Sequence, residues 1–442
     1  MEETIKRYYN IDKNLEIAVE VASNPYNIPP EFLFNMAARK NLKREFLFVS
    51  KVIGKHLPMV PITLELIGAI LARSWIKGRE GRSLPDTLIL VEVFKKIQAG
   101  AWVSSEEMKI IKSIIATPIA LKHKTLFIGF AETATGLAQA VFNSFSNAAY
   151  IHTTREAINT VTASVLFQEE HSHAVEHQLY PLDPELLNNF QDIVLVDDEL
   201  TTGKTALNLI KKLKGTSFGV ISILDWREKE AEELYENYRD KKLQVCSLIK
   251  GNIAEKKTGE TKALDKVGSV EVSKPASYRE IIYGEGSYLE NYLIQGGRFG
   301  ISSEQQHNFK KSLKGIAKEL KSLRNGGNCL CLGWEEFIYI PCVISEELGE
   351  KVYFQSSTRS PIYAKDIANY AITGKVSFTT SEDCETQKFL YNIPKDFYEQ
   401  VILFTEKPLK EEKKQELIGI FNGYNIADFI FVSFSEGGRI IE

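Results

Sequence analysis

Residues 194–205 read VLVDDELTTGKT, and ALNLIKKLKG follows them at 206–215. The apolar start predicts a buried strand, the amphipathic end predicts a helix, and a turn rich in Thr and Gly joins the two. A turn that opens a helix offers free backbone N–H groups and the positive end of the helix dipole, and both bind phosphate. Gly203 lets the backbone approach such a ligand closely. This stretch therefore predicts an α/β fold with a site for a phosphorylated sugar at a strand end.

Side chains in the same stretch add to the predicted site. Asp197 and Asp198 stand at the strand tip, where their carboxylates can accept hydrogen bonds from the vicinal hydroxyls of a sugar. Thr201, Thr202 and Thr205 supply hydroxyl donors. Two alternatives stay open. A GxxxxGK[ST] nucleotide loop would need a Gly where this chain has Asp198, and a purely structural turn would rarely carry two adjacent acids before Thr-Thr-Gly.

Short apolar runs alternate with amphipathic stretches along the rest of the chain, as is typical of α/β layers around a mostly parallel sheet. A length of 442 residues predicts two or three domains. The polar segment 250–274 predicts a linker or surface hairpin, with a domain boundary between it and about residue 297. The predicted strands cover residues 46–49, 125–129, 149–152, 193–196, 218–224, 329–332, 351–354, 401–404 and 429–434, and the predicted helices cover 65–76, 136–145, 206–213 and 338–348.

The chain carries an internal repeat. Residues 129–155 align without gaps on residues 333–359, and the offset of 204 becomes 208 where residues 193–196 align on 401–404. Either one fold has been duplicated, or two α/β units share the same rhythm of strand, loop, helix and strand.

The second copy lacks the residues of the predicted phosphate site, so we expect an α/β scaffold that does not bind the same ligand in the same way. Its polar residues after the first two strands stand where ligands bind in open α/β sheets. We expect Arg359 to bind an anion and Glu336 a hydroxyl or amine, beside Thr358 and Ser360; the alternative is a structural Arg–Glu pair. The replacements are Thr405 for Asp197, Glu406 for Asp198, Glu411 for Gly203 and Lys413 for Thr205.

Composition and charge exclude several classes of protein. Lys and Arg number 54 against 58 Asp and Glu, a net charge of −4, so no electrostatic footprint for nucleic acid or an anionic membrane exists. No apolar run reaches the roughly 18 residues of a membrane span, and from the acidic start MEETIKRYYN we do not expect a signal peptide. Five cysteines, an odd number, fit a reducing compartment. We expect a cytoplasmic protein.

The segment 194–205 resembles the signature of type I phosphoribosyltransferases, which use phosphoribosyl pyrophosphate (PRPP): a hydrophobic strand, two acids and a Thr/Gly loop that ends in Thr. Residues 126–140, LFIGFAETATGLAQA, have the form of that family's pyrophosphate loop. Most of the chain resembles a bacterial group in which such a domain, of the orotate phosphoribosyltransferase type, is fused to a C-terminal TRSP domain in gene clusters associated with tellurium resistance. The wider resemblance is carried by REFLFVSKVIGKHLP at 44–58, LDWR at 224–227, GGRFG at 296–300 and STRSPI at 357–362.

The resemblance implies an α/β architecture with a Rossmann-like parallel sheet in a phosphoribosyltransferase domain over residues 1–250. A linker or hairpin would cover 251–296, and a TRSP α/β domain, which the repeat marks as a candidate degenerate copy of the first, would cover 297–442. The implied reaction transfers the ribose 5-phosphate of PRPP to a nucleobase-like acceptor with release of pyrophosphate. The implied cofactor is Mg²⁺, bridging pyrophosphate and ribose oxygens.

The resemblance also assigns residues. Asp197 and Asp198 would contact the ribose hydroxyls, and Arg155 would meet pyrophosphate; these three are the expected catalytic residues. The expected PRPP-binding residues are Glu199, Leu200, Thr201, Thr202, Gly203, Lys204 and Thr205 around the 5-phosphate, and Ala131, Glu132 and Thr133 facing pyrophosphate.

In this family a mobile loop precedes the signature and closes over PRPP, and three histidines crowd that interval here. His171, His173 and His177 could donate to pyrophosphate or an acceptor, could form a metal site because the last two have the i, i+4 spacing of zinc ligands, or could lie in a solvated segment. Orotate-type relatives favour lysine in this loop. Lys51 could reach an anionic substrate, or it belongs to a basic surface loop.

A regulatory protein that senses PRPP without catalysis is the alternative function. Such relatives often lose one of the two acids, whereas this chain has both, which favours an enzyme. The expected partners are small molecules, namely PRPP and a base-like acceptor, and a homodimer is the expected assembly.

Overall fold

The computed structural model describes residues 5–12, 15–39, 45–167, 177–257, 278–290, 292–367, 369–379, 387–436 and 438. The chain forms two compact units. Unit 1 comprises Met1–Leu33, Thr63–Gly259 and Gly297–Asn308, and unit 2 comprises Phe34–Ile62, Glu260–Gly296 and Phe309–Glu442. Both units are discontinuous in sequence, whereas the expected domains at 1–250, 251–296 and 297–442 are continuous stretches.

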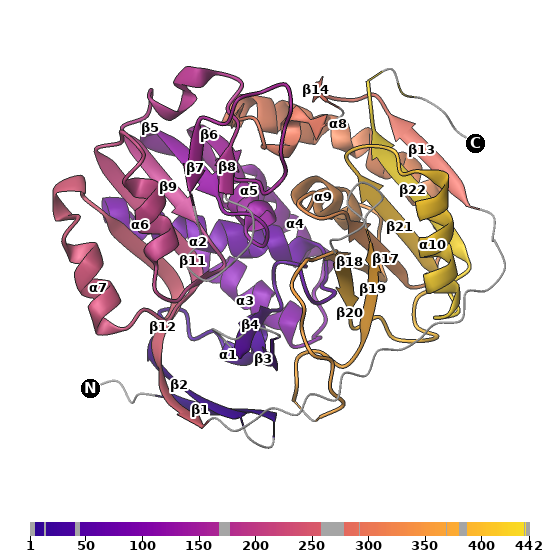
Figure 1. Cartoon of the computed structure of the whole chain (residues 1–442), viewed down its shortest axis with the longest axis horizontal. Coiled ribbons are helices and arrows are strands. Elements are labelled where there is room, and N and C mark those ends of the chain that lie inside the picture. The colour runs from indigo at the N-terminus through magenta and orange to yellow at the C-terminus, as the bar shows by residue number, and fades with distance from the viewer. Residues whose placement is uncertain are drawn as a thin grey trace. The chain divides into compact units, whose positions relative to one another are not determined.

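One sheet, parallel in its middle, forms the centre of unit 1 (Figure 1). In spatial order its strands are β1 (Ile5–Asp12), β2 (Leu15–Ser23), β12 (Gln244–Lys257), β11 (Ser217–Asp225), β9 (Asp192–Val196), β5 (Ile119–Gly129), β6 (Phe145–His152) and β16 (Ile301–Ser302). The pairs from β12 to β6 are parallel, and the flanking pairs are antiparallel. Short β10 (Glu199–Leu200) also pairs in parallel with β11. The near-continuous apolar runs of the middle strands fit burial on both faces.

Helices and a small hairpin complete unit 1. Ser104 opens α4 with a capping box, because its hydroxyl accepts from Glu107 N at 3.1 Å and Glu107 Oε2 accepts from Ser104 N at 2.9 Å. The hairpin consists of β7 (Val165–Phe167) and β8 (His177–Leu179). The helices are α1 (Pro30–Leu33), α2 (Ile62–Glu80), α3 (Thr87–Gln98), α4 (Ser105–Ala116), α5 (Thr135–Asn143), α6 (Lys204–Ile210) and α7 (Lys229–Glu236).

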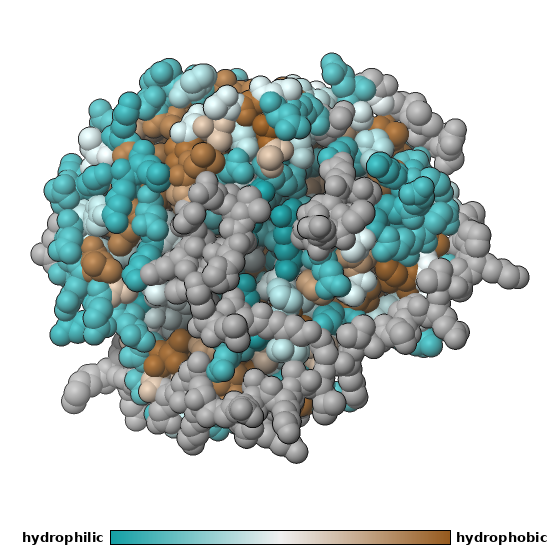
Figure 2. Space-filling view, viewed as in Figure 1, coloured by the Kyte–Doolittle hydropathy of each residue, from teal (hydrophilic) through white to brown (hydrophobic). Residues whose placement is uncertain are grey.

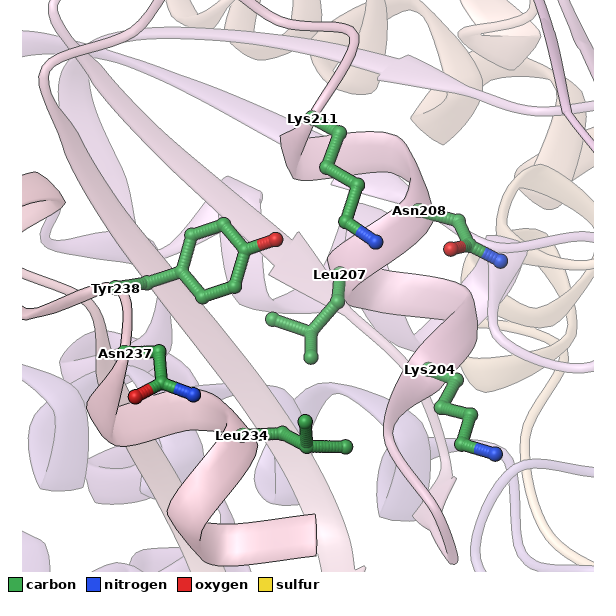
Figure 3. Close-up of a pocket in the computed structure, with 7 residues that line it drawn as sticks. All are labelled: Lys204, Leu207, Asn208, Lys211, Leu234, Asn237 and Tyr238. Carbon is green, nitrogen blue, oxygen red and sulfur yellow. The ribbon is translucent and has the colours of Figure 1, made fainter.

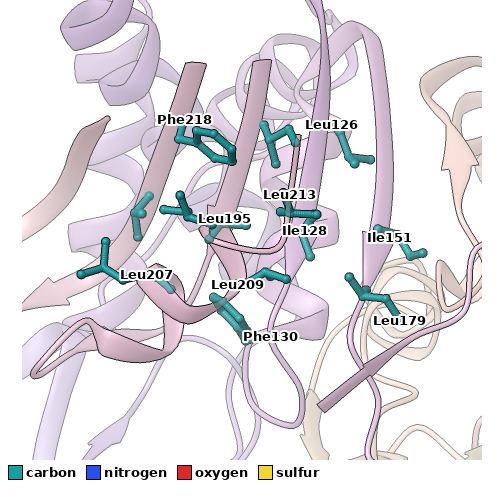
Figure 4. Close-up of a cluster of buried hydrophobic side chains, with 14 of the residues drawn as sticks. Leu126, Ile128, Phe130, Ile151, Leu179, Leu195, Leu207, Leu209, Leu213 and Phe218 are labelled. Carbon is teal, nitrogen blue, oxygen red and sulfur yellow. The ribbon is translucent and has the colours of Figure 1, made fainter. Parts of the chain in front are cut away.

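A hydrophobic cluster joins α6 to the middle strands of unit 1 (Figure 4). Leu195 of β9 and Phe218 of β11 meet Leu207 and Leu209 of α6, and all four side chains are at most 4% exposed. Burial of each such side chain stabilises the fold by roughly 1.5–3 kcal/mol. The cluster therefore fixes α6, and with it the turn that precedes α6, against the strand ends.

A second, entirely parallel sheet forms unit 2. In spatial order its strands are β13 (Arg279–Tyr283), β22 (Asp428–Phe434), β21 (Gln400–Thr405), β17 (Cys329–Gly333) and β18 (Val352–Ser356). The hairpins are β3 (Phe34–Ala38) with β4 (Phe46–Ser50), β14 (Tyr288–Leu289) with β15 (Tyr292–Leu293), and β19 (Lys375–Thr379) with β20 (Gln387–Tyr391). The helices are α8 (Ser303–Ser322), whose first residues belong to unit 1, α9 (Tyr339–Glu346) and α10 (Glu411–Asn422).

The segment after β4 extends the edge of the unit 2 sheet. Met59 and Phe354 exchange backbone hydrogen bonds of 2.9 and 2.8 Å, and Ser356 N donates to Gly54 O. Because of these contacts, residues 34–62 belong to unit 2, although these residues precede most of unit 1 in the sequence.

The predicted strands and helices are present at the predicted places, with ends shifted by a few residues. The linker or hairpin expected at 250–274 is partly wrong. β12 continues to Lys257 because its second half pairs with β2, and the rest of that segment lies outside the described residues.

The predicted repeat is present in strand order and register. The order β11-β9-β5-β6 of unit 1 corresponds to β22-β21-β17-β18 of unit 2. Gly129 pairs with His152 and Val196 in unit 1, and in unit 2 Gly333 pairs with Ser356 and Phe404, which are the residues that offsets of 204 and 208 require.

Loop hydrogen bonds repeat as well. Ala131 N donates to Thr153 Oγ1 at 2.8 Å in unit 1, and Glu335 N donates to Ser357 Oγ at 2.9 Å in unit 2. Each unit also holds a hairpin strand by a backbone bridge to the residue after that hydroxyl: Thr154 pairs with Gln178, and Thr358 pairs with Phe389. Agreement at this level of detail favours duplication of one fold over a shared rhythm.

Among the described residues, no helix is long and apolar enough to cross a membrane. On the face drawn in Figure 2, hydrophilic side chains cover most of the surface of α6 and α7.

We predict that the equivalent glycines Gly129 and Gly333 both resist substitution. A Cβ at Gly129 would lie 2.6 Å from Ala138 Cβ, and one at Gly333 would lie 2.4 Å from Phe337 O. Gly129→Ala and Gly333→Ala should each lower the free energy of unfolding by about 1–3 kcal/mol, measured by urea denaturation. The control Gly315→Ala, in α8 with nothing within 4 Å, should instead raise it by roughly 0.5–1 kcal/mol. Equal effects at all three positions would contradict the packing described here.

Candidate functional site

The loop between β9 and α6 follows a strand end, as predicted. β9 ends at Val196, and the half-buried Asp197 and Asp198 come directly after it. α6 begins at Lys204, and Gly203 before it has φ +67°, in the left-handed region that favours glycine. The backbone thus turns sharply between the two acids and the helix.

Tyr235 of α7 fixes this turn. Its hydroxyl donates to Gly203 O at 2.7 Å, and a Cβ at Gly203 would lie only 2.5 Å from that hydroxyl. The Tyr235 ring packs against the guanidinium of Arg227, whose Cζ is 4.3 Å from the ring centroid. Arg227 makes two hydrogen bonds of 2.8 Å to Asp225 at the end of β11. Burial raises the pKa of Tyr235 well above its usual range, so the phenol keeps its proton and stays a donor.

The loop after β5 meets the two acids. Thr133 Oγ1 donates to Asp198 Oδ1 at 2.8 Å, and Asp198 N donates to Asp197 Oδ1 at 2.9 Å. The contact follows from the parallel register, because Gly129 at the end of β5 lies opposite Val196 at the end of β9. Two loops that are far apart in sequence therefore form one polar edge.

The same loop is held from β6 and from the hairpin. Ala131 N donates to Thr153 Oγ1, which lies 2.9 Å from Nδ1 of His177. His177 is buried in β8. Thr154 and Gln178 exchange backbone hydrogen bonds of 2.9 Å. In this structure His177 therefore contacts the loop after β5 through a threonine.

The remaining candidates of unit 1 lie around this edge or outside the described residues. Arg155 is half-buried three residues after the end of β6, and Glu132 is half-buried in the loop after β5. Lys204 is exposed, and Thr205 is half-buried, in the first turn of α6. His171 and His173 lie outside the described residues, and so does any metal site that includes them.

The candidates of unit 2 lie in that unit's own loops. Glu336 and Thr358 are buried, Ser360 N donates to Thr358 Oγ1 at 3.1 Å, and Arg359 Nη2 donates to Glu335 Oε2 at 3.1 Å. The carboxylate paired with Arg359 is thus that of Glu335, one residue before the predicted Glu336. Lys51, another predicted site residue, follows β4 and is half-buried in unit 2.

A pocket of about 450 Å³ opens between α6 and α7 (Figure 3). Leu207 and Leu234 point toward each other across it, and Lys204, Asn208, Lys211, Asn237 and Tyr238 complete its lining. Neither Asp197 nor Asp198 lines this pocket, so it is distinct from the edge where the two loops meet.

Oxygen atoms dominate the edge. Within the part of the chain that the structure describes, no group of three or more His, Cys, Asp or Glu side chains could hold a metal ion. The carboxylates of Asp197 and Asp198 fit a hard cation that takes one or two protein oxygens and completes its shell with ligand oxygens and water, as Mg²⁺ commonly does.

Three residues that organise the site were not singled out from the sequence. Arg227 belongs to the quoted LDWR segment, and its position two residues after an acid at a strand end was an available signal. Tyr235 and Thr153 gave none, because their roles depend on contacts between distant segments.

Two family models match the chain. Residues 33–252 match a family described as phosphoribosyl transferase, and residues 295–421 match a family described as the TRSP domain that lies C-terminal to it. A search among curated proteins finds no match to the chain.

Several solved structures resemble the chain weakly. Adenine phosphoribosyl transferase from Trypanosoma brucei, in complex with AMP, pyrophosphate and ribose-5-phosphate, is 12% identical over 58% of this chain and 92% of its own, with a TM-score of 0.32. Adenine phosphoribosyltransferase from Leishmania donovani is 18% identical over 33% and 66%, with a TM-score of 0.23. A hypothetical protein from Neisseria gonorrhoeae with bound ppGpp is 12% identical over 45% and 84%, with a TM-score of 0.22.

We predict that Tyr235→Phe lowers the free energy of unfolding by about 1 kcal/mol, because the buried Gly203 O loses its hydrogen-bond donor. Urea denaturation measures the change. The control Tyr238→Phe, at the rim of the open pocket, should stay within about 0.5 kcal/mol of the parent. A Tyr235→Phe variant as stable as the Tyr238→Phe variant would contradict the role of the phenol.

Proposed function

Because the chain belongs to the family that joins a phosphoribosyl transferase domain to a C-terminal TRSP domain, we propose that unit 1 transfers the ribose 5-phosphate of PRPP to a nucleobase-like acceptor. Pyrophosphate is the leaving group. The observation that carries this proposal is the hydrogen bond from Thr133 to Asp198, which joins the loop after β5 to the loop after β9.

The two joined loops suit the two halves of PRPP. The turn at 201–205 offers hydroxyls and backbone N–H groups, with Gly203 in a left-handed conformation, to the 5-phosphate. The carboxylates of Asp197 and Asp198 accept hydrogen bonds from the ribose hydroxyls. The loop of Ala131, Glu132 and Thr133, which reaches Asp198 through Thr133, faces pyrophosphate.

The reaction breaks the bond between the anomeric carbon and pyrophosphate and forms a bond from that carbon to a ring nitrogen of the acceptor, which loses a proton. Positive charge develops on the ribose, and the carboxylates of Asp197 and Asp198 stabilise it. Holding acceptor and ribose in line contributes to catalysis as well.

Mg²⁺ fits this site, with Asp197 or Asp198 as its protein ligand. When bound, it would neutralise charge on the pyrophosphate oxygens. The cationic Arg155, close after β6, is proposed to assist at the same oxygens.

We predict that Asp198→Asn lowers turnover by roughly 10²–10³-fold, because a preorganised charge at the developing cation is lost. The free energy of unfolding should change by less than about 1 kcal/mol, since the side chain is half-buried at a strand end. Pyrophosphate release, followed by ³¹P NMR with Mg²⁺ and a panel of nucleobases, measures turnover.

The control for this variant is Glu230→Gln, which removes the same charge from the exposed surface of α7. It should keep full turnover. Equal turnover in Asp198→Asn and Glu230→Gln would contradict the assignment, and PRPP binding without release of pyrophosphate on any acceptor would favour a sensor.

We predict that PRPP stabilises the protein against thermal unfolding only when Mg²⁺ is present. A ligand at 100 times its Kd raises the free energy of unfolding by about 2.7 kcal/mol. Differential scanning fluorimetry measures the shift, with ATP and Mg²⁺ as the comparison. If ATP raised the melting temperature and PRPP did not, the result would favour a nucleotide-binding loop at residues 194–205.

A further inference from the structure

The candidate site of unit 1 consists of two parts, and unit 2 has a counterpart of only one of them. The kept half comprises the loop after β17, the end of β18 and the hairpin strand β20, which match the loop after β5, the end of β6 and β8 in hydrogen bonds and register. The lost half is the phosphate turn. Thr201, Thr202 and Gly203 align with Leu409, Lys410 and Glu411, and α10 begins at Glu411, so unit 2 lacks both the threonine hydroxyls and the left-handed glycine of the turn.

The kept half of unit 2 contains a cluster of cations around one residue, Glu335. Lys388 Nζ lies 2.9 Å from Glu335 Oε1, Arg359 Nη2 lies 3.1 Å from Glu335 Oε2, and Lys55 Nζ donates to Glu335 O at 2.7 Å. The side chain of Lys388 is 1% exposed and that of Arg359 is 28% exposed. Two of the three cations are therefore held inside the unit, and Arg359 is the member that solvent reaches.

The repeat shows what changed to produce this cluster. Glu335 aligns with Ala131, and Lys388 occupies in β20 the place that His177 occupies in β8, one residue before the bridging Gln178 or Phe389. In unit 1 the hairpin residue contacts a threonine hydroxyl, whereas in unit 2 it contacts a carboxylate. At the same point of the fold, unit 2 has a lysine and a carboxylate where unit 1 has a histidine and a hydroxyl.

Burial of an ammonium group is expensive, and one carboxylate shared between Lys388 and Arg359 offsets only part of that cost. An oxyanion with several negative oxygens can take bidentate hydrogen bonds from a guanidinium while it also neutralises an ammonium. An oxyanion bound between Lys388 and Arg359 would take the place of the Glu335 carboxylate, which pairs with both cations.

We propose that unit 2 is a second anion site, which binds a pyrophosphate group through Arg359 and Lys388 and excludes the ribose 5-phosphate half of PRPP. The group is either free pyrophosphate or the diphosphate of a larger molecule. The proposal rests on the proposed function in one respect, because the pyrophosphate role of the kept half is taken from unit 1.

Calorimetric titration of the full chain with inorganic pyrophosphate tests the proposal. We expect two binding sites, of which one weakens at least tenfold in Arg359→Gln and stays unchanged in Asp198→Asn. The matched control is Arg279→Gln, which breaks an ion pair with Asp428 at the amino ends of the same sheet and should leave both sites intact. ADP in place of pyrophosphate distinguishes a larger diphosphate from the free anion.

Thermal melts supply a second readout, namely the rise in melting temperature that pyrophosphate causes. If the ion pairs of Glu335 were only structural, substitutions in them would not change this rise. Glu335→Gln removes the internal carboxylate, so its melting temperature should fall and pyrophosphate should raise it by more than in the parent chain. Arg359→Gln should lose that response.

Two results would overturn the second site: equal pyrophosphate binding in Arg359→Gln and Arg279→Gln, or no extra stabilisation of Glu335→Gln. Failure of the proposed function looks different. In that case a single pyrophosphate site remains, it depends on Arg359, and PRPP gives no transfer with any acceptor.

Discussion

Parallel pairing of β5 with β6 on one side and β9 on the other is the constraint on which the rest of unit 1 depends. Parallel strands that share a register end at the same edge of the sheet, so Gly129, His152 and Val196 lie in one row. The loops that follow these strands therefore begin side by side. The hydrogen bonds from Ala131 to Thr153 and from Thr133 to Asp198 follow directly, and they make one polar site from three separate stretches of sequence.

The turn before α6 depends on a further set of contacts, which the register alone does not provide. The hydrophobic cluster holds α6 against β9 and β11, and the phenol of Tyr235 holds Gly203 from α7. Arg227 and Asp225 hold the phenol ring in turn. The phosphate site proposed for this turn would need such support, because backbone donors cannot adjust as flexible side chains do.

Much of this could be predicted from sequence, and the reason is periodicity. Buried parallel strands such as 193–196 are short apolar runs that can be recognised without their partners. The segment VLVDDELTTGKT predicts a strand, a turn and a helix from its own residues. The repeat can be detected in the sequence because the offset of 204 holds without a gap from Gly129 to Arg155. Contacts between segments that are distant in the sequence could not be predicted from it. Nothing in the order of residues says that His177 reaches Thr153, that Tyr235 lies beside Gly203, or that residues 34–62 pack in unit 2.

The central claim is that the loops at 131–134 and 201–205 form one ligand site, and hydrogen exchange of their backbone amides tests it most directly. The account predicts that PRPP with Mg²⁺ slows exchange in both loops together. The pocket between α6 and α7 shares Lys204 with the second loop, and exchange in the rest of its lining should change little. Protection confined to that pocket, or to one loop without the other, would contradict it.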